Sequence, residues 1–307
     1  MGTRSTLSVV VPAYNEAGRI AEGLTRIEAA LRAEGLAERT LEILVVDDGS
    51  SDGTAAVVRG LTALELPITL VPLGRNRGKG AAVRAGVAHA RGDLTCFIDA
   101  DASIDPRHLA DIVRALEHAP VAIGDRSSGG RAIAYRSPLR SAMGRVFNAL
   151  VRSLSGVSVV DTQCGCKGFT TAAGRLLLGL GRIEGFAFDV ELLRNAKLLG
   201  LEVATVPVEW SDVEGSHVRR LLDPIAMATA LLRARLGERR RAVPAVATEE
   251  QPPRFPGTVQ LRSAGRWFAT VPLGPSGLAA VAPLGQAQPL RLRWLARHGI
   301  EELVLIP

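Results

Sequence analysis

Three aspartates follow one apolar run, and their spacing is suited to metal or phosphate chemistry. The segment CFIDADASID, residues 96–105, carries Asp99, Asp101 and Asp105 directly behind that run. An Asp-x-Asp pair at the end of a buried strand can hold Mg²⁺ or Mn²⁺, with water and phosphate oxygens completing the shell. Such a cation would neutralise charge on a leaving diphosphate. For an isolated pair, turn chemistry is the more common explanation, and Asp105, which precedes Pro106, is more simply a helix cap.

Two further polar clusters follow other apolar runs. PAYNE closes the first run and DDGS closes the second. Because the carboxyl ends of parallel strands meet at one edge of a sheet, the three clusters should converge there. Asp48 could accept the imide N–H of uracil, Tyr14 and Pro12 could wall the base, and Glu16 would lie near the ribose or base. This convergence favours a binding site over unrelated turns.

Basic residues near these clusters could contact phosphate. The segment GRNRGKGAA lacks the G-x-x-x-x-G-K-[ST] spacing of a phosphate loop and does not follow the first strand as a dinucleotide motif would. Lys79 remains a candidate diphosphate contact, with a solvated lysine at a helix entry as the alternative. Arg126, Arg136 and Arg140 lie in a Gly/Ser-rich stretch, where guanidinium groups could bind phosphate or simply face solvent.

Alternating strands and helices must position these residues. Buried strands are expected in LSVVVP, LEILVV, ITLVPL and LTCFID, which alternate with helices over 16–34, from Ser51 or Asp52 to about residue 64, and after the Gly-rich segment. This order predicts an α/β fold with a doubly wound, mostly parallel sheet.

The second half of the chain is less regular. We expect helices over 138–154, 171–180, 187–199 and 224–236, a strand in LEVATVPVEW, and a loop at DTQCGCKGF. Residues 1–241 would form the main domain, 242–256 a linker and 257–307 a small appendage that is rich in β-structure and has no assigned function.

Charge and composition limit the partners. Of the net charge of +6 on 307 residues, +5 lies in residues 216–241, where seven arginines oppose Asp223 and Glu238. This basic segment suits an anionic lipid or substrate, whereas an aromatic content of 4% argues against nucleic acid. The helix expected over 224–236 has an apolar stripe beside these arginines, which suits peripheral contact with a membrane; an ordinary packing helix is the alternative.

Cysteine usage and hydropathy bear on localisation. Cys96, Cys164 and Cys166 are an odd set with neither a disulfide framework nor zinc-site spacing, which favours a reduced compartment. No apolar run approaches the ~20 residues of a spanning helix. We therefore expect a cytoplasmic protein with peripheral contact at the inner face of the membrane.

Five segments occur in an order typical of one enzyme family. SVVVPAYNE, ILVVDDGSSDGT, NRGKGAAVRAG, FIDADA and DTQCGCKGF together resemble family 2 glycosyltransferases of GT-A fold. RSPLR, FAFDVEL and VEGS make the chain similar to the polyprenyl-phosphate sugar transferases, especially the dolichyl-phosphate β-glucosyltransferases. The resemblance covers roughly residues 5–237.

The resemblance implies roles for individual residues. The nucleotide would be bound by Pro12, Ala13, Tyr14, Glu16, Val46 and Asp48. Asp99, Ala100 and Asp101 would lie at the diphosphate and its Mg²⁺ or Mn²⁺, with Ser103 as a further contact. Arg126 would approach the diphosphate or the acceptor phosphate. Candidates on the acceptor side are Arg136, Arg140, Asp189, His217 and Arg219.

The chain departs from the family pattern at two places. His217 stands where the family commonly has a lysine, so that Arg219 or Arg220 would have to supply the late diphosphate contact. Cys166 stands where a phenylalanine is usual, and both cysteines of DTQCGCK are interpreted as packing residues.

The resemblance implies an inverting transfer of a hexose, glucose in the first place, from a UDP-sugar to a polyprenyl phosphate. A phosphate acceptor is already ionised and needs little help from a base. One alternative is a transferase with a soluble acceptor, which would need a base such as Asp189 or Glu191. Another is a nucleotide-sugar-binding protein without catalysis, although such a protein has little need of an Asp-x-Asp pair.

Overall fold

A seven-stranded sheet forms the centre of the computed structural model, which describes residues 5–127, 132–133, 161–199, 201–211, 258–263, 266–272 and 302–306. The strand order is β3-β2-β1-β4-β7-β5-β8, and only β7 runs antiparallel to its neighbours. The strands are β1 (Leu7–Ala13), β2 (Thr40–Asp47), β3 (Ile68–Pro72), β4 (Leu94–Ile98), β5 (Val121–Asp125), β7 (Cys166–Thr170) and β8 (Val203–Pro207).

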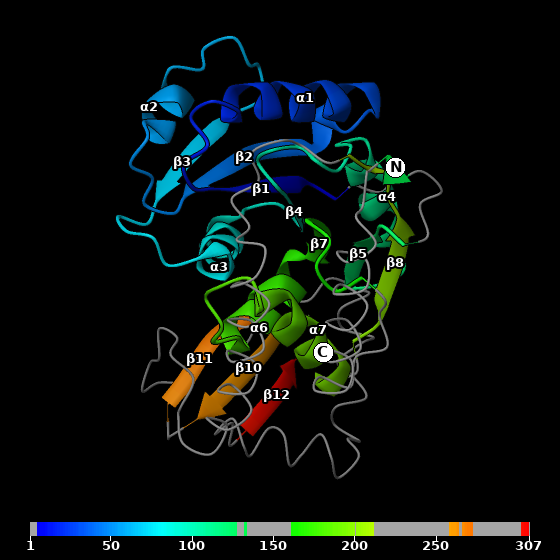
Figure 1. Ribbon diagram of the computed structural model, residues 1–307. Helices are drawn as coiled ribbons and strands as arrows, with labels where there is room; N and C mark the ends of the chain where they lie inside the picture. The colour runs from blue at the N-terminus through cyan, green and yellow to red at the C-terminus, as the bar shows by residue number, and fades with distance from the viewer. Residues whose placement is uncertain are drawn as a thin grey trace, which may run out of the picture.

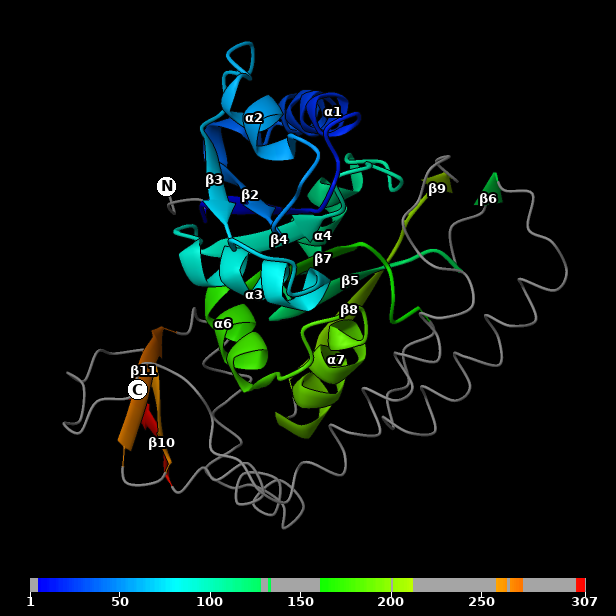
Figure 2. The same cartoon turned by 60° about the vertical axis from the view of Figure 1, so that its left-hand side comes forward.

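Helices cover both faces of this sheet (Figure 1). The first layer is α1 (Ile20–Ala33), α2 (Thr54–Arg59) and α4 (His108–Ala115). A short 3₁₀ helix, η1 (Ala37–Arg39), lies between α1 and β2. The second layer is α3 (Lys79–His89), α6 (Thr171–Leu180) and α7 (Phe188–Leu199). Figure 2 shows the same two layers from another side. The strand–helix alternation predicted for the first half is therefore present.

The central strands are apolar on both faces because each face meets a helix layer. On β1, Val9 and Val11 belong to the core beneath α1 and α4, whereas Val10 belongs to the core beneath α3. All three side chains have no solvent exposure. This explains why the parallel strands read as continuous apolar runs rather than as alternating patterns.

The predicted elements differ from the structure in several places. The helix expected over 16–34 begins only at Ile20. The helix expected from Ser51 or Asp52 to about residue 64 covers Thr54–Arg59, with Gly53 as its N-cap and Gly60 as its C-cap. The DTQCGCKGF segment is not only a loop, because its second half is the buried strand β7. Strand β5 was not predicted, although its five residues are all buried. Helices over 171–180 and 188–199 agree with expectation.

The remaining strands form two small sheets. β6 (Ala132–Ile133) pairs with β9 (Trp210–Ser211), at the end of the predicted LEVATVPVEW strand. In the C-terminal part, β10 (Thr258–Ser263) pairs on either side with β11 (Arg266–Pro272) and β12 (Glu302–Ile306), beside α6 (Figures 1 and 2).

Several predicted features lie outside the described residues. They are the helices over 138–154 and 224–236, the linker at 242–256, and the candidates Arg136, Arg140, His217, Arg219 and Arg220. Within the described part of the chain, no helix combines the length and apolar character needed to cross a membrane.

Candidate active site

The loops after β1 and β2 are joined into one structure at the carboxyl end of the sheet. The N–H of Asn15 donates to Ser50 Oγ at 2.9 Å, and the N–H of Ser51 donates back to Asn15 Oδ1 at 2.9 Å. Asn15 has a positive φ of 55°, a backbone conformation that asparagine tolerates better than most residues. The N–H of Glu16 donates to Thr54 Oγ1 at 2.8 Å. PAYNE and DDGSSDGT therefore hold each other in place.

Asp48 connects these loops to the Gly-rich segment. Its two carboxylate oxygens accept the N–H groups of Arg77, at 2.8 Å, and Gly78, at 2.7 Å. Burial raises the pKa of Asp48, although these two N–H groups oppose the rise. Gly49 has a φ of 72°, and a Cβ there would lie 2.5 Å from the backbone nitrogen of Asn76. The sequence thus brings three loops together around one carboxylate.

The other candidate nucleotide residues differ in what they can offer a ligand. The Tyr14 side chain is 39% exposed, so its ring is available as the wall of a base site. Pro12 is half-buried and Ala13 is buried. Val46 is fully buried in the core beneath α3, so only its backbone could contact a ligand. Glu16 forms a paired ion contact with Arg19, with nitrogen–oxygen distances of 2.8 and 2.9 Å.

Asp99 is held from two sides at the end of β4. Lys79 Nζ, on the first residue of α3, lies 2.6 Å from Asp99 Oδ1. On the other side, a Cβ on Gly165 would lie 2.0 Å from Asp99 Oδ2, so this carboxylate fits only because residue 165 is glycine. Burial alone would lower the pKa of Lys79, but the nearby charges of Asp99 and Asp189 outweigh it and raise that pKa. Lys79 therefore stays protonated.

The rest of the Asp-x-Asp loop is strained but well supported. The carboxylate of Asp101 accepts the N–H of Ser103 at 3.0 Å, its only hydrogen bond among the described residues. Ala102 has a φ of 45°, which is costly for alanine and typical of backbone held for function. Ala100 is buried, and its carbonyl oxygen lies where a Cβ on residue 23 would be, which explains Gly23 in α1. The loop therefore presents Asp99 and Asp101 as partly exposed carboxylates.

Asp105 differs from its two neighbours. Its carboxylate accepts the N–H of Arg107 at 3.0 Å and forms an ion pair with that side chain. Helix α4 begins only at His108, with Arg107 as the N-cap. Asp105 caps the turn before α4 rather than the helix itself, and it takes no part in the pair formed by Asp99 and Asp101.

The donor set fits a hard divalent cation that shares its shell with a ligand. Asp99 and Asp101 supply carboxylate oxygens, the donors that Mg²⁺ and Mn²⁺ prefer. Among the described residues, no group of three or more histidines, cysteines, aspartates or glutamates is arranged to hold a metal alone. A cation at this place therefore needs further oxygens, such as those of a diphosphate.

Asp189 lies beneath this loop and not on an open surface. It is 2% exposed, and its Oδ1 lies 2.7 Å from the ammonium nitrogen of Lys167, which is fully buried in β7. The Lys167 ammonium also donates to the carbonyl of Cys164 at 2.5 Å. Burial raises the pKa of Asp189 and outweighs the positive charges of Lys167 and Lys79, which lower it. The predicted acceptor-side role of Asp189 therefore has no exposed carboxylate to support it.

Arg126, at the end of β5, is oriented by a residue that sequence reasoning missed. Its Nε and Nη2 donate to the two oxygens of Asp161 at 2.7 and 2.8 Å, and its backbone N–H donates to Asp161 at 3.0 Å. Burial opposes ionisation of Asp161, but the guanidinium of Arg126 outweighs it and holds the pKa of Asp161 below its usual range. Within the described part of the chain, the hydrogen bonds of Arg126 involve its backbone N–H, Nε and Nη2 and not the third nitrogen, Nη1.

Comparison with known proteins gives the family. Residues 8–173 match the family described as Glycosyl transferase family 2. The chain belongs to glycosyl transferase family 2. It is 38% identical over 220 residues to dolichyl-phosphate beta-glucosyltransferase ALG5C of Trichomonas vaginalis, which covers 68% of this chain and 65% of that protein. The Drosophila melanogaster dolichyl-phosphate beta-glucosyltransferase is 39% identical, over 69% of this chain and 69% of its own length. The Saccharomyces cerevisiae dolichyl-phosphate beta-glucosyltransferase is 34% identical, over 75% of this chain and 74% of its own length.

Solved structures show the same fold. Glucosyl-3-phosphoglycerate synthase from Mycobacterium tuberculosis, in complex with Mn²⁺ and UDP-glucose, superposes with a TM-score of 0.54 at 22% identity over 88% of both chains. A mannosyltransferase from Pyrobaculum calidifontis, in complex with GDP-Man and Mn²⁺, gives a TM-score of 0.50 at 22% identity over 79% of this chain and 67% of its own. The predicted family and the α/β GT-A fold are therefore confirmed.

Two further groups of this glycosyltransferase have structural roles. Glu191 accepts the N–H groups of Arg182 and Ile183, both at 2.8 Å, and burial raises its pKa.

The cysteines are buried, and burial raises the pKa of Cys96 to about 12 and that of Cys164 to about 11. Neither thiol can supply a thiolate near neutral pH, in agreement with a packing role.

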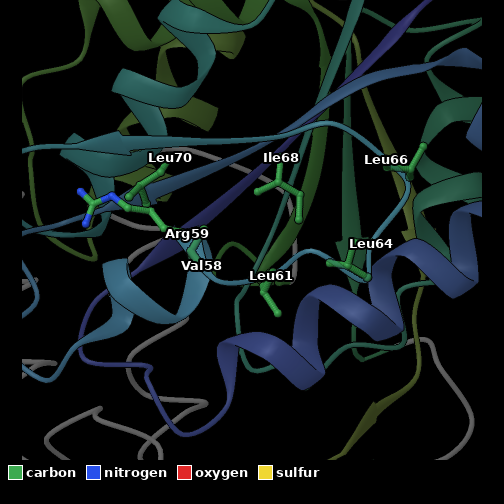
Figure 3. A pocket seen from close by; sticks show the side chains of 7 residues that line it. All are labelled: Val58, Arg59, Leu61, Leu64, Leu66, Ile68 and Leu70. Carbon is green, nitrogen blue, oxygen red and sulfur yellow. The ribbon is translucent and has the colours of Figure 1, made fainter.

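A cavity of about 250 Å³ lies apart from these loops (Figure 3). It is bounded by α2, β3 and the segment between them, with Val58, Leu64 and Ile68 among its lining and Arg59 at its side. None of the lining residues belongs to the loops that carry Asp48, Asp99 or their neighbours. The candidate active site is therefore the loop edge of the sheet and not this cavity.

Proposed function

We propose that the protein transfers glucose from UDP-glucose to a polyprenyl phosphate, with inversion at the sugar carbon. The similarity to three dolichyl-phosphate beta-glucosyltransferases at 34–39% identity supports the reaction. The observation that carries it is the order of the loops at the carboxyl edge of the sheet. Asp48 follows β2, Asp99 and Asp101 follow β4 with Lys79 beside Asp99, and Arg126 follows β5, which lies on the other side of β4 from β2. This order along the edge of the sheet matches the order of the uracil base and the diphosphate of the donor, followed by the phosphate of the acceptor.

The nucleotide end of the donor is assigned to the joined loops. Each oxygen of the Asp48 carboxylate has two acceptor positions, and one on each is used by Arg77 or Gly78. A remaining position can accept the imide N–H of uracil. The exposed ring of Tyr14 would cover one face of the base. Glu16 would lie near the ribose or base.

The diphosphate is assigned to Asp99, Ala100 and Asp101. The two carboxylates would hold Mg²⁺ or Mn²⁺, which supplies positive charge to the leaving diphosphate. Lys79 brings a protonated ammonium to the same place and donates to a phosphate oxygen. The close contact with Gly165 fixes the position of the Asp99 carboxylate at this edge of the sheet.

The acceptor phosphate is assigned to Arg126, whose orientation is set by Asp161. A phosphate monoester has a second pKa of about 6 and is mostly ionised at neutral pH, so it attacks without a general base. A hydroxyl acceptor would need such a base. The burial of Asp189 and its ion pair with Lys167 fit the phosphate acceptor better than the hydroxyl acceptor.

We assign the transferase to residues 1–241 and the appendage to 257–307, where β10, β11 and β12 form an antiparallel sheet. The basic residues 216–241 are proposed to meet an anionic membrane surface, at about 1 kcal/mol for each arginine near anionic lipids. This would place the enzyme at the cytoplasmic face of the membrane that carries its acceptor.

Release of UDP from UDP-glucose tests the proposed function. It is measured with Mn²⁺ in the presence and absence of a short polyprenyl phosphate, for the wild type, Asp101→Asn and the control Asp105→Asn. We expect release that requires both Mn²⁺ and the lipid phosphate, a loss of at least about a hundredfold in Asp101→Asn, and little change in Asp105→Asn. Equal release by the wild type and Asp101→Asn would contradict the assignment.

A further inference from the structure

The ammonium of Lys79 lies against one carboxylate oxygen of Asp99, and the other oxygen lies against Gly165. Nζ lies 2.6 Å from Oδ1, while Oδ2 faces the backbone of Gly165 with no room for even a methyl group. We propose that Lys79 acts as an internal competitor of the divalent cation, so that the cation binds strongly only when the donor diphosphate arrives and draws Lys79 away from Asp99. The inference rests on the proposed function, because it takes Asp99 as a ligand of the cation.

Lys79 cannot simply move into solvent. It is the first residue of α3, and the turn before it is fixed by the hydrogen bond from Gly78 to Asp48. The next residue, Gly80, is packed so closely that a Cβ there would lie 2.6 Å from the Cβ of Phe188. The Lys79 side chain is only 16% exposed, and its ammonium lies 6.0 Å from the centre of the Phe97 ring. An ammonium displaced from Asp99 must therefore find another anion nearby.

Among the residues that the structure describes, no carboxylate near Lys79 is left without another partner or role. The carboxylates that act on Lys79 are those of Asp99, Asp189 and Asp101. Asp189 already pairs with Lys167 at 2.7 Å, in a site where neither side chain is more than 3% exposed. Asp101 would itself be taken by the cation. A cation that binds alone would therefore leave the Lys79 ammonium close to a second positive charge without compensation.

A nucleoside diphosphate removes this conflict. Its phosphate oxygens can ligate the cation and accept from Lys79 at the same time, which replaces the charge that Asp99 had supplied. Binding of the cation and of the nucleotide is then positively coupled. Because such coupling is reciprocal, the nucleotide should also bind more tightly when the cation is present.

The inference predicts a gain of function when the ammonium is removed. In Lys79→Met, Asp99 Oδ1 is free before any ligand binds, so Mn²⁺ should bind more tightly without nucleotide. In the presence of UDP the same variant should gain nothing, because it has also lost a diphosphate contact. Lys79→Arg keeps the positive charge and should resemble the wild type. Arg75→Met removes a charge from the same Gly-rich segment without touching Asp99, and it serves as the matched control.

The test measures the affinity of the full chain for Mn²⁺. Mn²⁺ is titrated with and without saturating UDP, and the concentration of free Mn²⁺ is read from its electron paramagnetic resonance signal. For the wild type we expect UDP to tighten Mn²⁺ binding by about tenfold or more. Without UDP, Lys79→Met should bind Mn²⁺ about tenfold more tightly than the wild type, whereas Lys79→Arg and Arg75→Met should not. Circular dichroism verifies that each variant is folded, and Lys79→Gln replaces Lys79→Met if the latter is not.

Each contrary result has a distinct meaning. If Mn²⁺ binds the wild type with UDP, but Lys79→Met and Lys79→Gln gain no affinity without UDP, the inference is wrong and the metal-dependent function stands. If UDP does not change Mn²⁺ affinity of the wild type, the inference is also wrong, whatever the variants do. If Mn²⁺ binds the wild type neither with nor without UDP, both the inference and the metal assignment are wrong.

Discussion

Lys167 and Asp189 form an ion pair of 2.7 Å beneath the candidate active site, in a place that solvent does not reach. Lys167 belongs to the antiparallel strand β7 and Asp189 to the first turn of α7. Loss of one partner would leave the other charge buried without compensation. The pair therefore ties the centre of the sheet to the helix that packs on it.

Removal of one partner should destabilise the fold strongly. We expect Lys167→Met to lower the free energy of unfolding by about 3–5 kcal/mol. The double variant Lys167→Met/Asp189→Leu should recover most of that loss, since no charge is then stranded. Urea unfolding followed by circular dichroism measures both. A double variant no more stable than Lys167→Met would argue against this account of the pair.

Asp189→Asn separates the two kinds of acceptor. If the acceptor is a phosphate, the variant should slow transfer only modestly, because no base is needed and Asp189 is buried. If the acceptor is a hydroxyl that depends on Asp189 as a base, the loss should be about 10²–10⁴-fold. Steady-state transfer rates of folded Asp189→Asn decide between the two.

Gly165 should be required for the position of Asp99. A Cβ at residue 165 would lie 2.0 Å from Asp99 Oδ2, so Gly165→Ala must displace that carboxylate. We expect transferase activity to fall by about a hundredfold while the fold remains. Gly179→Ala is the matched control, since a Cβ there meets nothing within 4 Å and alanine favours its helix. Comparable activity in the two variants would contradict the proposed position of the cation.

The pairing of Asp161 with Arg126 should appear as a dependence of stability on pH. The pKa of Asp161 is lowered in the folded state, so its contribution is present above the unfolded value of about 3.9 and is lost as the pH falls through the folded value. Asp161→Asn should cost about 1.5–3 kcal/mol at neutral pH, and this difference should shrink towards about pH 3. Urea unfolding of both proteins across that range is the measurement. A difference that stays constant to acid pH would show that Asp161 is not stabilised by Arg126.

Asp48 should contribute to nucleotide affinity. We expect Asp48→Asn to weaken UDP binding by about tenfold or more, because the amide offers one acceptor oxygen in place of two. Calorimetric titration with UDP measures this effect. Asp93→Asn serves as the control, since Asp93 accepts the N–H of Thr6 at the start of β1, the opposite end from the candidate site. Equal UDP affinity in Asp48→Asn and Asp93→Asn would remove Asp48 from the nucleotide site.

Local patterns in the sequence predict the first half of the chain well for a physical reason. Buried parallel strands are continuous apolar runs, and polar residues at their carboxyl ends must share one edge of the sheet. These two rules are enough to bring Asp48 and Asp99 to the same edge. The helix expected over 16–34 follows from another local rule, because Ile20, Leu24 and Ile27 recur at helical spacing, and all three side chains are buried in α1.

What sequence reasoning missed depends on contacts between distant segments. Strand β7 contains Lys167 and Gly168, which break the apolar pattern, and the lysine is tolerated only because Asp189 from α7 meets it. Asp161 pairs with Arg126 across 35 positions of sequence. The partner of Lys79 was likewise not predicted, since its helix position gave no sign of Asp99. A polar residue inside an otherwise strand-like segment was the available signal for Lys167.

The fate of labelled glucose tests the identity of the acceptor. UDP-[¹⁴C]glucose is incubated with the full chain, Mn²⁺ and either a polyprenyl phosphate or 3-phosphoglycerate, and the label is partitioned between organic and aqueous phases. If glucose is transferred to the lipid phosphate, label enters the organic phase only when the polyprenyl phosphate is present, in a product that mild acid hydrolyses to glucose. Transfer to 3-phosphoglycerate with none to the lipid phosphate would contradict the proposed acceptor.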